Sequence, residues 1–402
     1  MKYVILICDG MADRPLEELG YRTPLEEAST PNMDLVAKNG ENGLALTIPE
    51  GMPAGSDVAN LSILGYDPRT YYTGRGPLEA ASMGVELNED DVAFRCNLIT
   101  ERDGLIADYS AGHISSLDAR ELIESLNEKL GGDGARFYPG VSYRHLLVLD
   151  HGERAECTPP HDVVGESVEA HLPRGEGSES LRRLIVKSRE VLEEHPVNLR
   201  RASDGEDPAN LIWLWGQGRV PLMDRLDKRY GLTGAIISAV DLVKGIGVYA
   251  GLRVVSVPGA TGYFDTDYRA KAEYAIRCLR ECDLVVVHVE AADEAGHIGS
   301  VEEKVRAIEN FDRHIVCRVL DELPGFGEYR LLLLPDHPTP IALRTHTRDP
   351  VPFALYGADQ RADHVRVYSE RAAEDGLFGL VSGWRLMDLM VRGSSIVTIR
   401  KD

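Results

Sequence analysis

The sequence feature that most constrains the fold is the stretch of residues 331–346, which reads LLLLPDHPTPIALRTH. Four consecutive leucines are typical of a strand buried on both faces, as in a parallel sheet covered by helices. Asp336 and His337 follow this strand directly, and His346 follows after a short loop. Ligands of open α/β sheets bind at the carboxyl ends of the strands, so we expect these side chains to lie in a cleft.

Two other predicted buried strands lead to the same kinds of residue. Residues 3–7 run into Asp9, and residues 284–289 run toward Asp293 and His297. Asp293 and His297 are four residues apart, so in a helix both side chains can face one ion. The three strand ends together supply three aspartates and three histidines, which is close to the ligand inventory of a two-metal site.

The pattern of strands and helices predicts an α/β protein with a doubly wound, mostly parallel sheet. Asp9 lies on the first strand while its expected fellow ligands lie beyond residue 290, so this core must be discontinuous. We expect a core formed by residues 1–75 and 206–402, with residues 76–205 inserted as a smaller α/β domain. Predicted core strands beyond the insertion are 211–215, 235–238, 252–257, 284–289, 331–334, 353–356 and 396–399. Long helices are expected at 266–282 and 300–323.

Ser56 is the candidate nucleophile. It follows a Gly/Pro turn and precedes residues that can open a helix, where a helix N-terminus would stabilise an attached phosphate. The alternative is an ordinary serine N-cap. The other candidate residues also have an interpretation without a function. Asp293 and His297 could lie in an ordinary solvated helix start, and His346 could be a surface histidine in a polar loop.

Mixed carboxylate and imidazole ligands suit borderline divalent ions such as Mn²⁺, Zn²⁺ or Co²⁺ better than Ca²⁺. Two such ions about 3.5–4 Å apart would clamp both oxygens of an in-line phosphoryl displacement. One of them would also lower the pKa of the Ser56 hydroxyl. The ligand chemistry therefore favours phosphoryl transfer through a serine.

The composition excludes some classes of partner. Asp and Glu number 65 against 44 for Lys and Arg, which gives a formal net charge of −21 and argues against binding nucleic acid or an anionic membrane. The first apolar stretch is too short for a signal peptide, and no apolar run approaches the roughly 18 residues of a membrane span. Six cysteines without C-x-x-C spacing fit a reducing cytoplasm.

The motifs together resemble the alkaline phosphatase superfamily, and more closely the archaeal type of cofactor-independent (2,3-bisphosphoglycerate-independent) phosphoglycerate mutase. The quoted stretches are DGMADRP from Asp9, GSDVAN around Ser56, DEAGH at 293–297, LPDH at 334–337 and HTRDPVPF from His346. TGRGPLEAAS at 73–82 and YPGVSYR at 138–144 favour the mutase branch. The likeness covers nearly the whole chain.

The resemblance implies two metal subsites, with Mn²⁺ favoured and Zn²⁺, Co²⁺ or Mg²⁺ as alternatives, and no 2,3-bisphosphoglycerate. Asp9, Ser56, Asp336 and His337 would hold one ion, and Asp293, His297 and His346 the other. Ser56 would accept the phosphoryl group of 3-phosphoglycerate and return it to the other hydroxyl of glycerate. The activity would serve glycolysis and gluconeogenesis in the cytoplasm.

The inserted domain would be a lid that binds the substrate. His113, Arg144, Lys244 and Arg75 are the candidate substrate-binding residues, while Arg95 and Arg219 are further candidates by position. The serine context differs from the bacterial NSEVGH, and the insertion is shorter than in bacterial relatives, so the bacterial set of lid arginines has no direct match here.

Two alternative functions remain open at this point. One is a metal-dependent phosphomonoesterase or phosphotransferase that acts on another small phosphorylated acid. The other is a metal-binding scaffold without catalytic activity. A mutase must exclude water from phosphoserine while glycerate reorients, which a closing insertion of this size would allow.

Overall fold

The computed structural model describes all residues except 133, 358–359 and 394–402, and it divides into two compact units. The first unit comprises residues 1–72 and 223–402, and the second comprises residues 73–222. Among the described residues, no helix is both long and apolar enough to cross a membrane.

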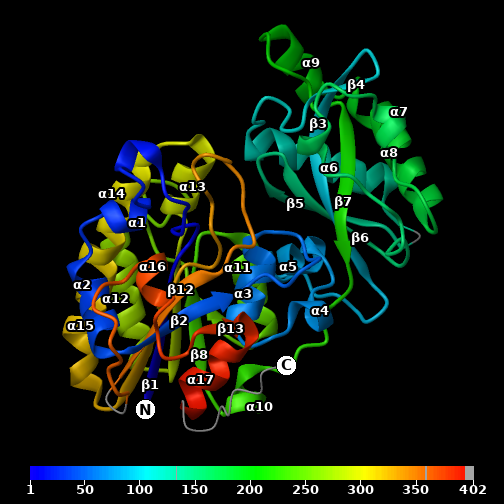
Figure 1. Ribbon diagram of the computed structural model, residues 1–402. Helices are drawn as coiled ribbons and strands as arrows, with labels where there is room; N and C mark the ends of the chain where they lie inside the picture. The colour runs from blue at the N-terminus through cyan, green and yellow to red at the C-terminus, as the bar shows by residue number, and fades with distance from the viewer. Residues whose placement is uncertain (133, 358–359, 394–402) are drawn as a thin grey trace. The chain divides into compact units, whose positions relative to one another are not determined.

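The first unit is built on an eight-stranded sheet in the order β13-β2-β12-β11-β1-β10-β8-β9 (Figure 1). All neighbouring strands are parallel except β12, which runs antiparallel to both β11 and β2. In sequence order the strands are β1 (Lys2–Cys8), β2 (Glu41–Leu46), β8 (Gly234–Ile237), β9 (Arg253–Val254), β10 (Leu284–Val289), β11 (Tyr329–Leu334), β12 (Val351–Gly357) and β13 (Leu380–Ser382). The predicted α/β class and mostly parallel sheet are confirmed.

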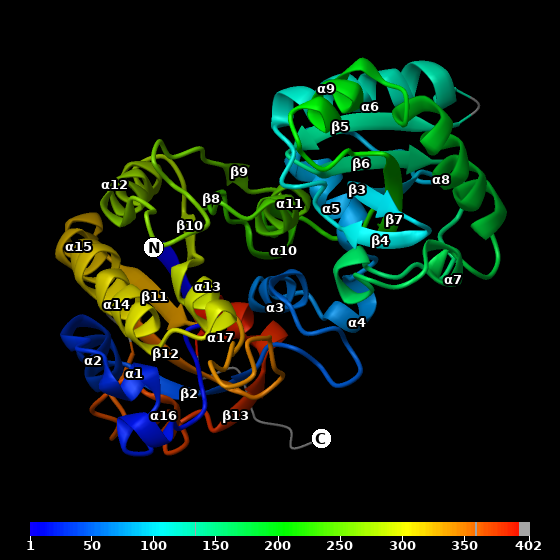
Figure 2. The same cartoon turned by 90° about the horizontal axis from the view of Figure 1, so that it is seen from above.

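Helices cover both faces of this sheet (Figure 2). One face carries α2 (Pro31–Asn39), α12 (Tyr268–Leu279), α14 (Val301–Phe311) and α15 (Cys317–Glu322). The other face carries α3 (Ser56–Ile63), α11 (Asp241–Tyr249) and α17 (Leu386–Arg392). Shorter helices are α1 (Pro24–Glu27), α4 (Pro68–Tyr71), α10 (Leu226–Tyr230) and α16 (Glu370–Ala373). Because both faces are covered, the central strands β1, β10 and β11 are almost completely buried, as the four leucines of β11 predict.

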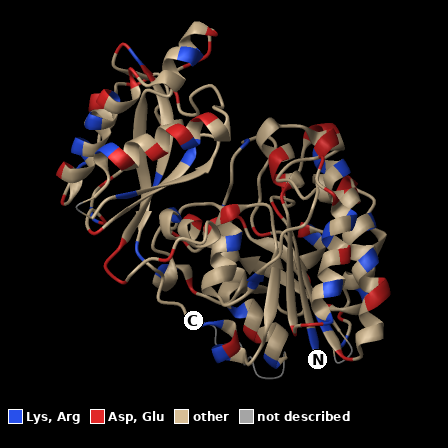
Figure 3. Ribbon diagram, turned by 180° about the vertical axis from the view of Figure 1, so that it is seen from behind, with Lys and Arg blue, Asp and Glu red and all other residues tan. Residues whose placement is uncertain are grey.

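The second unit has its own core around an antiparallel sheet, in which β3 (Val92–Arg102) pairs with β4 (Leu105–Asp108), β6 (Arg144–Leu149) and β7 (Leu211–Gly218). Strand β5 (Arg136–Val141) completes the sheet beside β6. Its helices are α5 (Arg75–Ser82), α6 (Ser116–Leu130), α7 (Val168–His171), α8 (Ser178–Leu192) and α9 (Pro196–Ser203). In both units most charged residues lie on the helices and loops, and few lie on the strands (Figure 3).

Three predictions about elements need correction. Residues 211–215 were assigned to the core, but they form β7 of the second unit, because apolar periodicity identifies a buried strand without identifying its partner. The strand predicted at 252–257 is only the two-residue edge strand β9, which ends before Pro258 and Gly259. The helix predicted at 300–323 is divided by a π-helical turn, Asp312–Val316. The strand predicted at 396–399 lies outside the described residues.

Candidate metal and phosphoryl-transfer site

Three adjacent parallel strands bring the predicted residues together. In the sheet β1 lies between β10 and β11, so their carboxyl ends are neighbours. Asp9 follows β1, and Asp336 and His337 follow β11. Beyond β10 the chain enters α13 (Ala291–Ile298), which carries Asp293. The helical geometry expected for residues 293–297 is thus present.

A glycine permits the close approach of two of these segments. Gly10 has φ +64°, and a Cβ built there would lie 2.5 Å from the Cα of Asp293. No side chain could be accommodated at this point without moving α13. The glycine therefore sets the separation between the loop that follows β1 and the helix that carries Asp293.

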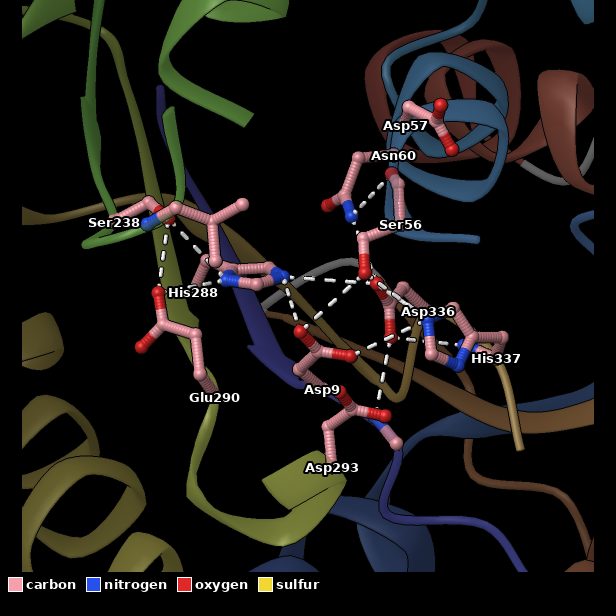
Figure 4. A network of polar contacts seen from close by, with 12 residues as sticks. Asp9, Ser56, Asp57, Asn60, Ser238, His288, Glu290, Asp293, Asp336 and His337 are labelled. Atoms are coloured by element: carbon pink, nitrogen blue, oxygen red, sulfur yellow. Dashed lines mark hydrogen bonds and ion pairs between the residues drawn. The ribbon is translucent and has the colours of Figure 1, made fainter. Parts of the chain in front are cut away.

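A first group of potential ligands comprises Asp9, His288 and Asp336, whose ligand atoms all lie within 4.8 Å of one another (Figure 4). All three side chains are almost completely buried. Asp336 is oriented by hydrogen bonds from the backbone N–H of Gly10, at 3.2 Å, and from the side chain of Asn60, at 2.8 Å. In contrast, Asp9 Oδ1 and His288 Nε2 are buried without a hydrogen-bond partner.

A second group comprises Asp293, His337 and His346, whose ligand atoms meet the same 4.8 Å limit. His346 Nε2 lies 3.3 Å from Asp293 Oδ1, and His297 Nε2 lies 3.2 Å from Asp293 Oδ2. The two imidazole nitrogens, His297 Nε2 and His346 Nε2, are 2.9 Å apart. The hydroxyl of Thr339 donates to Asp293 and so helps to orient it.

Ser56 is the first residue of α3, as predicted, and its hydroxyl points into the same region (Figure 4). Ser56 Oγ lies 3.0 Å from His337 Nε2 and 3.5 Å from Asp9 Oδ2. His337 Nε2 is also 3.5 Å from Asp9 Oδ1, so His337 adjoins the first group as well as the second. All seven predicted ligands are consequently gathered at one edge of the sheet.

The electrostatics show a surplus of buried negative charge. Burial, then the charges of Asp336 and Asp293, raises the pKa of Asp9 well above its usual range. The pKa of Asp293 is lowered despite burial, because it is hydrogen-bonded to His297 and His346. The hydrogen bond to Asp293 raises the pKa of His297 to about 9. Carboxylates crowded in this way ionise together only when cations neutralise them.

The donor set fits divalent metal ions. Carboxylate oxygens and imidazole nitrogens converge in two groups, and two buried donor atoms lack any hydrogen bond. Burying such polar atoms unsatisfied is costly, and coordination of a cation would satisfy them. The mixture of oxygen and nitrogen donors is one that transition metals bind in proteins.

The second unit contains a cluster of cations on aromatic rings. The guanidinium carbons of Arg75 and Arg95 lie 5.9 and 4.4 Å from the ring centroid of Trp215. Burial, together with the charges of Arg75 and Arg144, lowers the pKa of Arg95, which is only 9% exposed. Glu79 forms an ion pair with Arg95 at 3.0 Å. Guanidinium groups gathered in this way can bind the carboxylate or phosphate of an anionic ligand.

The other substrate-binding candidates are distributed unevenly. His113, with φ +52°, and Arg144 both adjoin the ring of Tyr143 in the second unit. Lys244 lies on α11 of the first unit, where it pairs with Asp241 at 3.1 Å. Arg219 forms ion pairs with Asp90 and Glu153.

Sequence reasoning missed three functional candidates. His288 was included in a predicted buried strand without a function. The pattern that could have identified it is a histidine in an otherwise aliphatic run, with Glu290 two residues later. Asn60, one helical turn after Ser56, binds Asp336 and the carbonyl of Ser56. His161 packs edge-on against Trp215 at 5.3 Å, and no local pattern marked it.

The fold and this site define an α/β enzyme with two groups of potential metal ligands beside a serine hydroxyl. Comparison with known proteins gives the family. The family model described as 2,3-bisphosphoglycerate-independent phosphoglycerate mutase matches residues 37–198. The enzyme of that name from Methanosarcina mazei is 56% identical over 396 residues, covering 98% of this chain and all of the relative.

Solved structures agree with this result. The PH0037 protein from Pyrococcus horikoshii has a TM-score of 0.84 at 32% identity, covering 97% of this chain and 96% of that one. The cofactor-independent phosphoglycerate mutase from Thermoplasma acidophilum has a TM-score of 0.69 at 27% identity, covering 98% and 99%. The chain belongs to the 2,3-bisphosphoglycerate-independent phosphoglycerate mutase family, and the resemblance found in the sequence is confirmed.

Proposed function

We propose that this chain interconverts 3-phosphoglycerate and 2-phosphoglycerate through a phosphoserine at Ser56. The observation that carries the proposal is the position of the Ser56 hydroxyl, 3.0 Å from His337 Nε2 and 3.5 Å from Asp9 Oδ2. It stands at the N-terminus of α3, where the positive end of the helix dipole would stabilise a phosphoryl group on the serine. Membership of the family supports the substrate.

Two divalent ions would be held by the predicted residues. Asp9, Ser56, Asp336 and His337 would bind one, and Asp293, His297 and His346 the other, with Mn²⁺ favoured over Zn²⁺, Co²⁺ or Mg²⁺. When bound, these ions supply positive charge that neutralises phosphate oxygens and acidifies a serine hydroxyl. The unpartnered oxygen of Asp9 supports this assignment.

The reaction would consist of two phosphoryl transfers, first to Ser56 and then back to glycerate. In the first step the bond from Ser56 Oγ to phosphorus forms while the bond from phosphorus to the 3-oxygen breaks. The serine proton is transferred to the departing oxygen, which yields glycerate. In the second step the 2-oxygen of glycerate forms a bond to phosphorus while the bond from phosphorus to Ser56 Oγ breaks, and the proton of the 2-hydroxyl is transferred to Ser56 Oγ. Asn60 holds Asp336 and the Ser56 carbonyl in place throughout.

The second unit would bind the anionic groups of the substrate. We include Arg75, Arg144 and His113 among its substrate-binding residues and add Arg95, because these cations gather around Trp215 and Tyr143. Lys244 of the first unit is a further candidate. Retaining glycerate in this way would separate a mutase from a phosphatase, since water must not reach the phosphoserine.

We also propose that the enzyme works in the cytoplasm. All six cysteines are free, and Cys8, Cys96, Cys278 and Cys282 are buried. Free thiols are typical of a reducing compartment. The expected partner is the small-molecule substrate.

The test is to label the nucleophile. Wild type, Ser56→Ala and the control Ser62→Ala, a buried serine on the same helix, would be loaded with Mn²⁺ and mixed with 3-[³²P]phosphoglycerate, then quenched rapidly. We expect labelled protein and mutase turnover in wild type and Ser62→Ala. Ser56→Ala should show no label and at least about a 10³-fold lower kcat, because no other nucleophile lies at this position. Normal turnover by Ser56→Ala would refute the assignment, and release of inorganic phosphate as the main product would indicate a phosphatase.

A further inference from the structure

His288 is a completely buried histidine of β10 whose two ring nitrogens face different surroundings (Figure 4). Nδ1 lies 3.2 Å from Glu290 Oε1. Nε2 lies 3.4 Å from Asp9 Oδ2 and 3.6 Å from Asp336 Oδ2, and it has no hydrogen-bond partner. The ring thus connects a buried carboxylate on one side to the first group of potential ligands on the other.

The surroundings of Glu290 determine which ring nitrogen carries a hydrogen. Glu290 Oε2 accepts from the ammonium of Lys271 at 2.8 Å, and Lys271 is itself completely buried. Glu290 Oε1 accepts from the Ser238 hydroxyl at 3.0 Å and from the Ala239 N–H at 2.9 Å. A carboxylate held by an ammonium and two further donors is ionised and can only accept hydrogen bonds. Nδ1 of His288 also lies 3.3 Å from Ser238 Oγ, but the Ser238 hydroxyl donates to Glu290, so a hydrogen on Nδ1 directed at Glu290 is the arrangement that fits these contacts.

Lys271 also ties this arrangement to the strand. Its Nζ donates to the carbonyl oxygen of His288 at 3.0 Å as well as to Glu290. The ring of His288 is consequently fixed in orientation, and in the neutral imidazole the lone pair is on Nε2. Nε2 points at two carboxylate oxygens, an arrangement that is repulsive unless a proton or a metal ion lies among the three atoms.

We propose that His288 Nε2 is a ligand of the metal ion held by Asp9 and Asp336, and that Glu290 and Lys271 are positioning residues that fix its tautomer. The inference rests on the proposed two-metal function and adds a ligand to that ion. A carboxylate bonded to the second nitrogen of a metal-bound histidine is a frequent means of orienting the ring and strengthening the ligand. Here a buried lysine extends that chain by one more residue.

The test is to count histidine nitrogens around bound Mn²⁺. Protein labelled with ¹⁵N-histidine would be examined by pulsed EPR after Mn²⁺ titration, for wild type, His288→Asn and Glu290→Gln. We expect His288→Asn to lose one set of ¹⁵N couplings and to bind one of two Mn²⁺ ions about 10–100-fold more weakly. Glu290→Gln, whose amide can donate to Nδ1, should weaken the same ion while the other stays unchanged.

The control is His145→Asn, which removes a buried histidine of the second unit and should leave the Mn²⁺ spectrum unchanged. Wild-type couplings and affinity in His288→Asn would overturn the inference and would make His288 a donor to the carboxylates instead. If His288→Asn does not fold, an unchanged Mn²⁺ affinity in Glu290→Gln overturns the inference on its own. Failure of wild type to bind Mn²⁺ would refute the proposed function itself.

Discussion

A buried ion pair beside the site gives a sharp stability prediction. Lys304 on α14 is completely buried, and its Nζ donates to Asp13 Oδ2 at 2.7 Å, to the Thr339 carbonyl at 2.8 Å and to the Ala12 carbonyl at 3.2 Å. Burial lowers the pKa of this lysine, while Asp13 opposes the shift. The ammonium thereby joins the loop that follows β1 to the loop that follows β11, the two loops that carry Asp9 and Asp336.

Lys304→Met would leave the Asp13 carboxylate buried without its cation. Breaking a buried pair from one side costs about 3–5 kcal/mol, because the remaining charge is uncompensated. For a unit of this size that loss corresponds to a fall in Tm of about 10 °C. Circular dichroism melts of chelator-treated protein would measure it, with Lys38→Met, which replaces an exposed lysine of α2, as the control. The double variant Asp13→Asn/Lys304→Met should recover part of the loss, since it removes the stranded charge. A loss below about 1 kcal/mol in Lys304→Met would refute this reasoning.

Three further predictions concern pH, backbone space and metal. Burial lowers the pKa of His145 to about 3, and its Nδ1 accepts the Gly140 N–H, so the folded state keeps the ring neutral. Stability from this group is complete above pH 6.5 and is lost as the pH falls toward 3. When the pH falls from 6.5 to 5, the free energy of unfolding of His145→Asn should therefore decrease by about 2 kcal/mol less than that of wild type. Urea unfolding followed by Trp fluorescence would measure both decreases, and equal decreases would contradict the prediction. Gly10→Ala should weaken Mn²⁺ binding about tenfold or more, because the added Cβ would collide with Asp293. Gly20→Ala is the control, since Gly20 has the same φ but no neighbouring atom within 4 Å, and it should leave the affinity unchanged. Calorimetry would measure both affinities, and equal values would contradict the reasoning. Removing divalent ions should lower the Tm of wild type, and Mn²⁺ at 100 times its Kd should restore about 2.7 kcal/mol, while a Tm indifferent to Mn²⁺ would contradict a site in the folded state.

The sequence was most informative where one physical cause dominates. The four leucines of β11 predicted a strand covered on both faces, and the polar residues that follow the three central strands predicted where the ligands converge. These signals are local, because burial on both faces and the end of a strand each leave a direct mark in the residue pattern.

The sequence was least informative where partners are distant. Nothing in residues 211–215 specified that they pair with β3 rather than with the core sheet. The role of His288 depends on Lys271, which lies 17 residues earlier on α12, and on Ser238 in a third segment. Such arrangements arise from tertiary packing, so a single sequence does not display them.

The central claim is that two cations lie beside the Ser56 hydroxyl. Crystals soaked in Mn²⁺ and measured at the manganese absorption edge test it most directly. We predict two anomalous peaks, one bounded by Asp9 and Asp336 and the other by Asp293 and His346, with Ser56 Oγ coordinated to the first. A map without peaks at these residues, or with Ser56 turned away from them, would contradict the account.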